Sequence, residues 1–434
     1  MSLPVLPQLP SYLAERVLRQ LDFSEVLTLS LVDRKTRHLL LPFIYRHMCT
    51  PTSEIHPYHL YAPPQCADVQ HHLAKHGRWV KRMRFNFTAC KVDNPFALIT
   101  ENYRHLPRIT QLKIQGVSGM HNAYMTGFLL PLRHTLTHLS LSQVERHNAR
   151  FDPEFLYHSL LHFTKLAVLE LIGSRLKLTY DQWCAIFRQC HGIRVLRVRG
   201  CGDDQIIRAA MECLPQLEKL QVSFHQVTPT VLAQVPYAFP HLTSLFVYPL
   251  SVQNNFIVEA ITPETLPRLK FLDMTCDRYD RSRPSVASLQ RFATMFAKPW
   301  PRLQSVVFDS ATLEDQVLHL IAKNCPQLRR IRLDDCYISP QGYRYAMQHC
   351  TGLDSFRVRN VKGGLSKAMI AAVVGSPKLH RLEMIINGFE TEWLFDLCPR
   401  LETLTELTLY KFNKNVNVEE LQKRLPHVKI SYAC

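Results

Sequence analysis

The segment CPQLRRIRLDDC, residues 325–336, contains the pattern that decides the fold of this chain. Leu328, Ile331 and Leu333 follow the order apolar-x-x-apolar-x-apolar, and Pro326 stands two residues before the first of them. Two apolar residues that are two positions apart place their side chains on the same side of a short β-strand. Because proline cannot continue a helix, it ends the preceding helix and the chain then turns into the strand.

The same pattern recurs along the chain at a nearly constant step. We take the first apolar residue of each copy as its anchor, and successive anchors are 24 to 34 residues apart. The thirteen anchors are Val80, Ile109, Leu136, Leu166, Ile193, Leu217, Leu242, Leu269, Leu303, Leu328, Leu353, Leu379 and Leu404. Leu425, Val428 and Ile430 form a possible further copy. This regularity predicts one strand-containing unit that is repeated along the chain.

Helical stretches of matching length separate the predicted strands. They include residues 203–214, 312–325, 339–350 and 365–376. In the second stretch, the apolar residues recur at helical spacing, at Leu313, Val317, Leu320 and Ile321. Thr312 precedes two acidic residues and is expected to start this helix. A single strand–helix unit cannot bury its apolar side, so stacked copies must share one core.

This pattern resembles the leucine-rich repeat, whose L-x-x-L-x-L core recurs roughly every 20–29 residues. The resemblance implies an α/β solenoid over residues 76–434 with about 13–14 repeats. It would be a horseshoe with a parallel sheet on its concave wall and helices outside. Cysteines after strands and at helix ends resemble the cysteine-containing subclass, whose thiols pack in the core rather than serve redox chemistry. They are Cys201 and Cys336 after strands, and Cys190, Cys325, Cys350 and Cys398 at helix ends.

Residues 1–48 precede the repeats and are expected to form a small all-α unit of three short helices. The motif LP-x-x-L at Leu9, Pro10 and Leu13, followed by S-L-V-x-R at residues 30–34, resembles an F-box. Three positions depart from that pattern. Tyr12 stands where F-boxes commonly carry an acid, Asp33 where they commonly carry cysteine, and Thr36 where they commonly carry tryptophan. The proline-containing residues 49–75 are expected to be a linker.

F-box proteins with such repeats are substrate-receptor subunits of Skp–cullin–F-box ubiquitin ligases. The resemblance implies a non-catalytic adaptor whose F-box binds a Skp-type adaptor, and through it a cullin, while the repeats bind a protein substrate. Apolar residues on so small a unit are expected to form part of an anchor patch. The candidates for contact with the Skp-type adaptor are Leu9, Pro10, Leu13, Val32 and Arg34.

Strand residues that flank the apolar positions face the opposite side of the sheet and are candidates for substrate binding. They are Arg197, Arg199, Phe246, Tyr248, Phe271, Arg330, Arg332, Arg357, Arg359 and Arg381. Guanidinium groups bind carboxylate or phosphate in bidentate geometry, so we expect an acidic or phosphorylated segment. The aromatic residues would supply apolar anchors. Alternatively, the arginines pair with neighbouring aspartates and form a solvated surface.

The formal charge of +16, from 52 Lys+Arg against 36 Asp+Glu, also suits an acidic partner. Two other functions stay open: a repeat scaffold with no link to ubiquitin, and a basic nucleic-acid-binding repeat protein. We do not expect nucleic acid, because the chain lacks basic stretches interleaved with aromatic residues on one motif.

Sequence motifs for catalysis are absent. The chain has no G-x-x-x-x-G-K, G-x-G-x-x-G or G-x-S-x-G, so we expect neither an enzyme nor a cofactor. His72 and His76, like His158 and His162, are four residues apart, but neither pair has the glutamate of H-E-x-x-H, so no metal is expected. We find no secretory leader and no membrane-spanning apolar stretch, which favours a cytoplasmic and/or nuclear location with free thiols.

Overall fold

The computed structural model describes the repeats and leaves most of the first 74 residues outside the description. The described residues are 47–49, 75, 77–86, 106–117, 127, 129–143, 153–173, 178–200, 203–223, 227–250, 256–276, 286–309, 313–334, 336, 338–359, 367–374, 376, 378–386, 403–411 and 418–433. The chain divides into two compact units, an N-terminal unit of Met1–Cys201 and a C-terminal unit of Gly202–Cys434. Each unit is described by itself.

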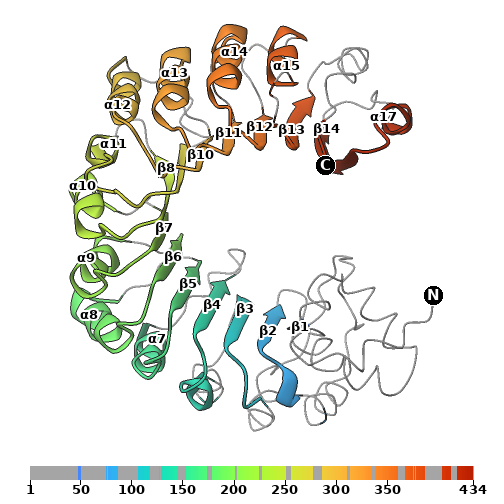
Figure 1. The fold of residues 1–434 in the computed structure, drawn as a ribbon. Coiled ribbons are helices and arrows are strands. Elements are labelled where there is room, and N and C mark those ends of the chain that lie inside the picture. Colours follow the sequence, from blue (N-terminus) through green and yellow to red (C-terminus); the bar gives the residue numbers. More distant parts are fainter. Residues whose placement is uncertain are drawn as a thin grey trace, which may run out of the picture. The chain divides into compact units, whose positions relative to one another are not determined.

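In each unit the predicted strands form a parallel sheet in which the strands follow one another in sequence order (Figure 1). The N-terminal unit contains β1 (His47–Cys49), β2 (Arg82–Asn86), β3 (Gln111–Val117), β4 (His138–Gln143), β5 (Val168–Ile172) and β6 (Val195–Arg199). The C-terminal unit contains β7 (Lys219–Ser223), β8 (Ser244–Leu250), β9 (Phe271–Cys276), β10 (Ser305–Asp309), β11 (Arg330–Asp334), β12 (Ser355–Arg359), β13 (Arg381–Ile386), β14 (Glu406–Lys411) and β15 (Lys429–Ala433). Strand β1 pairs with β2 and lies upstream of the first predicted copy.

The helices of each unit lie on one side of its sheet (Figure 1). The N-terminal unit has η2 (Gly77–Trp79), η4 (Leu130–Leu132), α7 (Pro153–Leu160) and α8 (Tyr180–Gln189). The C-terminal unit has α9 (Asp204–Cys213), α10 (Pro229–Ala238), α11 (Phe256–Ala260), α12 (Val286–Phe296), α13 (Asp315–Asn324), α14 (Pro340–His349), α15 (Lys367–Val374) and α17 (Val418–Arg424). The fold is therefore an α/β leucine-rich-repeat solenoid, as the sequence predicts. Among the described helices, none has the length and apolar character needed to cross a membrane.

The anchors make the core of the repeats. All thirteen are buried, with at most 2% of their surface exposed. The turn that leads into each strand is closed by the anchor itself: the Leu328 amide donates to the Cys325 carbonyl at 3.1 Å, across Pro326. Leu353 donates to Cys350 at 3.0 Å in the same way, and Leu217 to Leu214 at 3.0 Å. The apolar-Pro-x-Leu pattern thus encodes a turn as well as a buried residue.

A second set of backbone bonds joins each repeat to the next. The carbonyl of Arg329 accepts from the amides of Asp354 and Ser355, at 2.9 and 3.0 Å. One repeat earlier, the carbonyl of Gln304 accepts from Arg329 and Arg330 at the same two distances. Because one carbonyl receives two amides, the start of each of these strands is held in register with its neighbour.

Three details of the sequence prediction are wrong. Helix α13 begins at Asp315 with Glu314 as its N-cap, so the predicted start at Thr312 is too early, and Leu313 is fully buried before the helix begins. Within this helix Leu318 is buried, whereas the predicted core residue Leu320 is half-buried. The last copy is shifted: Val428 takes the anchor position, bonds to the Leu425 carbonyl at 3.1 Å and is one residue closer to its strand.

The cysteines at the helix ends are core residues, as predicted. Cys190, Cys325, Cys350 and Cys336 are free and buried. Burial raises the pKa of Cys190 and of Cys350 to about 12, and it raises that of Cys325 as well. These thiols therefore stay protonated and act as packing groups. Cys201 and Cys398 lie outside the described residues.

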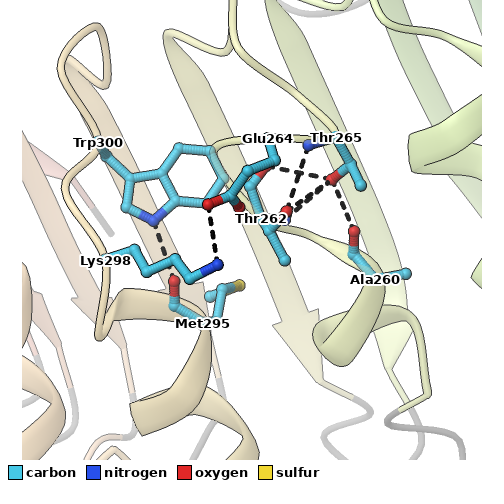
Figure 2. A network of polar contacts seen from close by, with 7 residues as sticks. All are labelled: Ala260, Thr262, Glu264, Thr265, Met295, Lys298 and Trp300. Atoms are coloured by element: carbon cyan, nitrogen blue, oxygen red, sulfur yellow. Dashed lines mark hydrogen bonds and ion pairs between the residues drawn. The ribbon is translucent and has the colours of Figure 1, made fainter.

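The repeat between Leu269 and Leu303 is the longest, and Figure 2 shows the polar contacts of the turn that ends it and of residues 260–265, which precede Leu269. Trp300 occupies the position that cysteine takes in the next repeat, and its indole donates to the Met295 carbonyl at 3.0 Å. On the surface nearby, Lys298 forms an ion pair of 2.8 Å with Glu264. A buried ring with a satisfied N–H thus takes the place of a small thiol.

Neighbouring helices are joined by an aspartate at the start of one and the N-cap of the next. The carboxylate of Asp315, the first residue of α13, accepts from the backbone amide of Ser339 at 2.8 Å and from its hydroxyl. Gly342 in α14 leaves the space for this carboxylate. A Cβ at that position would lie 2.7 Å from Asp315 Cγ and 2.9 Å from Ile338 Cγ2.

We predict that Gly342→Ala destabilises the C-terminal unit by about 1–3 kcal/mol, although alanine is the better helix former. The methyl group would displace Asp315 and break its bonds to Ser339. Urea unfolding followed by circular dichroism measures the change.

Gly352→Ala is the matched control, because its Cβ would meet nothing closer than the Leu328 carbonyl oxygen at 3.5 Å. Equal unfolding midpoints for Gly342→Ala and the wild type would show that the clamp between α13 and α14 has no energetic role.

Candidate functional site

The side of each sheet that faces away from the helices is called the open face here. It includes the second residue after each anchor, which we call the first row, and the fourth residue after each anchor, which we call the middle row. The first row is Arg82, Gln111, His138, Val168 and Val195 in the N-terminal unit, and Lys219, Ser244, Phe271, Ser305, Arg330, Ser355, Arg381 and Glu406 in the C-terminal unit. The middle row is Arg84, Lys113, Ser140, Glu170 and Arg197, then Gln221, Phe246, Asp273, Val307, Arg332, Arg357, Glu383 and Thr408. No described helix covers this face in either unit (Figure 1).

Glu170 is the centre of a polar cluster on β4, β5 and β6. It is 6% exposed and pairs with the guanidinium of Arg197, its register partner on β6. The imidazole of His138 lies 3.7 Å from the same carboxylate oxygen. Burial alone would raise the pKa of Glu170, but Arg197 and His138 outweigh it, so the pKa lies below its usual range. Burial also dominates at His138 and lowers its pKa. The predicted site residue Arg197 is therefore already paired with an acid.

Arg84 on β2 is held in a different way. Its Nε and Nη2 donate to the amide oxygen of Gln115 on β3, at 2.9 and 2.6 Å. A neutral amide fixes the direction of the guanidinium but leaves its positive charge uncompensated. Lys113 is the register partner of Arg84, so two cations are neighbours in the middle row.

The C-terminal unit carries a continuous ladder of ion pairs on β11, β12 and β13. Asp334 is almost fully buried and accepts from Arg332 Nε and Nη2 at 2.9 and 2.8 Å. Arg357 lies 3.7 Å from the same carboxylate and 3.1 Å from Glu383. The predicted site residues Arg332 and Arg357 are thus register partners on adjacent strands. Both contact Asp334, and Arg357 also contacts Glu383.

The two first-row arginines of this region are also paired. Arg381 on β13 bonds to Glu406 on β14 at 2.6 Å, and this pairing holds the pKa of Glu406 below its usual range. Arg330 lies 4.0 Å from Asp354 and remains exposed. Exposed pairs of this kind contribute little to stability and are open to exchange with a ligand.

The predicted aromatic residues belong to two neighbouring strands, β8 and β9. Phe246 and Phe271 are partly buried on the open face. In register, Phe246 is beside Asp273, and Phe271 is beside Ser244 and Ser305. The backbones of Tyr248 and Arg359 belong to β8 and β12, but their side chains lie outside the description. Phe246 and Phe271 give the open face an apolar area, which β10 separates from the charged ladder.

The remaining predicted positions are Arg199, the five candidates for adaptor contact and the two histidine pairs. Arg199 ends β6 and is exposed. The five candidates for adaptor contact, Leu9, Pro10, Leu13, Val32 and Arg34, lie outside the described residues, as do His72 and His76. His158 and His162 are exposed, and His158 Nε2 lies 3.4 Å from a carboxylate oxygen of Glu154 on the same helix.

The alternative that arginines pair with neighbouring aspartates is borne out at Asp334 and Asp354, but sequence reasoning missed the glutamates that also pair with arginines. Glu170, Glu383 and Glu406 were not selected, and neither were His138 and Lys113. The signal was available: Glu170 and Arg197 are both the fourth residue after an anchor, so aligned repeats place them on adjacent strands. Reading each row across the anchors would have found every one of these neighbours.

Comparisons with known proteins show similarity in fold only. No protein-family model matches the chain, and no curated protein matches it. Among solved structures, the chain is similar to the complex of Rad7 and Elc1 in yeast, with a TM-score of 0.47, 14% identity and coverage of 85% of this chain and 78% of that one. It is also similar to the leucine-rich-repeat protein LegL7 from Legionella pneumophila, with a TM-score of 0.43, 13% identity and coverage of 74% and 97%. The complex of TLR13 with ssRNA13 gives a TM-score of 0.38, 17% identity and coverage of 69% and 43%. Likenesses at this level carry no information on partners.

We predict that Glu170→Gln lowers the stability of the N-terminal unit by about 1–3 kcal/mol near neutral pH, because it leaves Arg197 without its carboxylate. A carboxyl group with a depressed pKa stabilises the fold above its unfolded pKa of about 4.3, and this contribution disappears as the pH falls through the lower folded value. The difference in Tm between the variant and the wild type should therefore shrink below about pH 4.

Glu154→Gln, at an exposed helical pair with His158, is the control and should change Tm little at any pH. A Glu170→Gln deficit that stays constant down to about pH 2 would contradict the ion-pair explanation and point to packing alone.

Proposed function

We propose that the chain is a non-catalytic adaptor that links a protein substrate to a Skp–cullin–F-box ubiquitin ligase. The observation that carries the proposal is the open face: in each unit one side of a long parallel sheet is lined mainly by polar side chains and is uncovered by described helices, and in the C-terminal unit two phenylalanines join them. A parallel sheet is ordinarily covered on both faces, so an uncovered face is a surface for another molecule.

A protein is the partner that best fits the open face. Phe246 and Phe271 offer apolar contact area beside the charged groups of the C-terminal unit, which is the composition of a protein–protein interface with anchors and a polar rim. The proposed substrate-contacting residues remain those of the sequence prediction. Because Arg332, Arg357 and Arg381 are held by acids, their guanidinium groups are ordered before a partner arrives, which lowers the entropy cost of binding.

The link to ubiquitin transfer rests on the resemblance of residues 1–48 to an F-box, in the order expected before such repeats. In this proposal Leu9, Pro10, Leu13, Val32 and Arg34 contact the Skp-type adaptor. The departures at Tyr12, Asp33 and Thr36 keep the scaffold function without a ubiquitin role as the alternative.

The test is capture of a purified Skp-type adaptor by the full-length chain and by the double variant Leu13→Asp, Val32→Asp. We expect the wild type to bind, and the variant to lose affinity by about tenfold or more, because an apolar interface core does not accept buried charges. Point variants are preferred to a deletion of residues 1–48, which would cut into β1 at His47–Cys49.

Tyr237→Ser is the control, since Tyr237 is 68% exposed on α10 and remote in sequence from the F-box-like motif. If the wild type binds no adaptor at concentrations where established F-box proteins do, the ubiquitin proposal fails and the scaffold function stands.

A further inference from the structure

The two units differ in how the cations of their open faces are balanced. Strands β2 to β6 contain five Lys and Arg residues, and Glu170 is their single acid. In the C-terminal unit, Arg330, Arg332, Arg357 and Arg381 each have a carboxylate within 4.0 Å. The row of arginines that the sequence singled out is thus largely neutralised within the protein, and the uncompensated charge lies elsewhere.

The uncompensated charge is concentrated on β2 and β3. Glu170 is on β5, three strands away from β2, and its charge is paired with that of Arg197 on β6. Arg82, Arg84 and Lys113 have no acid within ion-pair distance among the described residues, and the contact of Arg84 is with the neutral amide of Gln115. Residues 75–86, which contain β2, include five Lys and Arg residues and no acid.

Geometry makes these three side chains one cluster. Lys113 is the register partner of Arg84, so their backbones are about 4.8 Å apart, and Arg82 is about 6.6 Å from Arg84 along the strand. Like charges on directly opposite strand positions destabilise a sheet. Arg82 and Arg84 are exposed, so an anion can reach them and relieve this repulsion.

We propose that the open face of β2 and β3, around Arg82, Arg84 and Lys113, binds an Asp/Glu-rich segment of the substrate protein. This inference rests on the proposed substrate-binding role of the open face and assigns its acid-recognising part to the N-terminal unit. The Arg/acid ladder of β11 to β13 is then an ordered polar surface that does not require an acidic ligand, because its arginines are already paired with acids.

One feature favours a carboxylate-rich peptide over a nucleic acid. The first and middle rows of β2 to β6 contain no Phe, Tyr or Trp, so bases of a nucleic acid would find no stacking platform. Arg84 already uses Nε and Nη2 on Gln115, so that edge is not available for a bidentate contact with either a carboxylate or a phosphate group. Carboxylates spaced along an extended peptide can instead contact the three separate cations singly.

The experiment measures fluorescence anisotropy of the full-length chain with a labelled peptide of about twelve residues, half of them glutamate, at about 0.15 M salt. The comparison probes are the same peptide with glutamine for glutamate, a phosphoserine peptide of equal charge, and a single-stranded RNA of equal charge. The variant is Arg82→Gln, Lys113→Gln, which leaves the Arg84–Gln115 contact in place. The matched control is Lys219→Gln, Lys429→Gln, with the same charge change at exposed positions of the C-terminal unit.

We expect the glutamate peptide to bind the wild type and the glutamine analogue not to bind. The affinity for the glutamate peptide should fall about tenfold or more in the β2–β3 variant and less than about twofold in the control. Equal losses in both variants, or a larger loss in the control, would overturn the assignment to β2 and β3. Tighter binding of the RNA or of the phosphoserine peptide would overturn the carboxylate assignment. Each of these failures leaves Skp-type adaptor capture unchanged, whereas failure of the proposed function is detected by the adaptor assay itself.

Discussion

Among the described residues, eleven backbone carbonyls, each directly after an anchor, receive two amides from the next repeat, and the rest of the fold depends on these contacts. The carbonyl of Thr243, for example, accepts from Lys270 and Phe271 at 2.9 and 3.0 Å. A slip of one residue in a strand would exchange its buried and open faces. By fixing where each strand starts, this contact keeps every apolar pair in the core and every first-row and middle-row residue on the open face.

The fixed register also determines the electrostatics of the open face. Since rows run straight across strands, the neighbours of a charged residue are the residues at the same offset in adjacent repeats. Arg357 is therefore paired with Glu383, and Arg197 with Glu170, whereas Arg84 lies beside Lys113. The same repeat geometry thus produces an ordered and nearly neutral ladder in one unit and a concentrated positive patch in the other.

The sequence predicted the solenoid well because its signal is repeated: every anchor that the spacing identified is buried, and cysteines such as Cys325 take the expected core positions. Local boundaries were less predictable. The start of α13 was misplaced because Leu313 reads as the first apolar residue of a helix although it packs before the helix begins. The pairing of Arg197 with Glu170 was missed because a single strand does not show its neighbours. The roles of the F-box-like residues stay predictions.

Hydrogen–deuterium exchange with single-residue resolution tests the shared carbonyl most directly. The donor pairs include Asp354 with Ser355, and His380 with Arg381, which bond to the carbonyls of Arg329 and Asp354. The side chains of His380 and Arg381 are exposed, so burial does not protect them. The account predicts that these amides exchange about a hundredfold or more slowly than an unstructured peptide. Exchange at the unstructured rate would contradict the register that the whole description depends on.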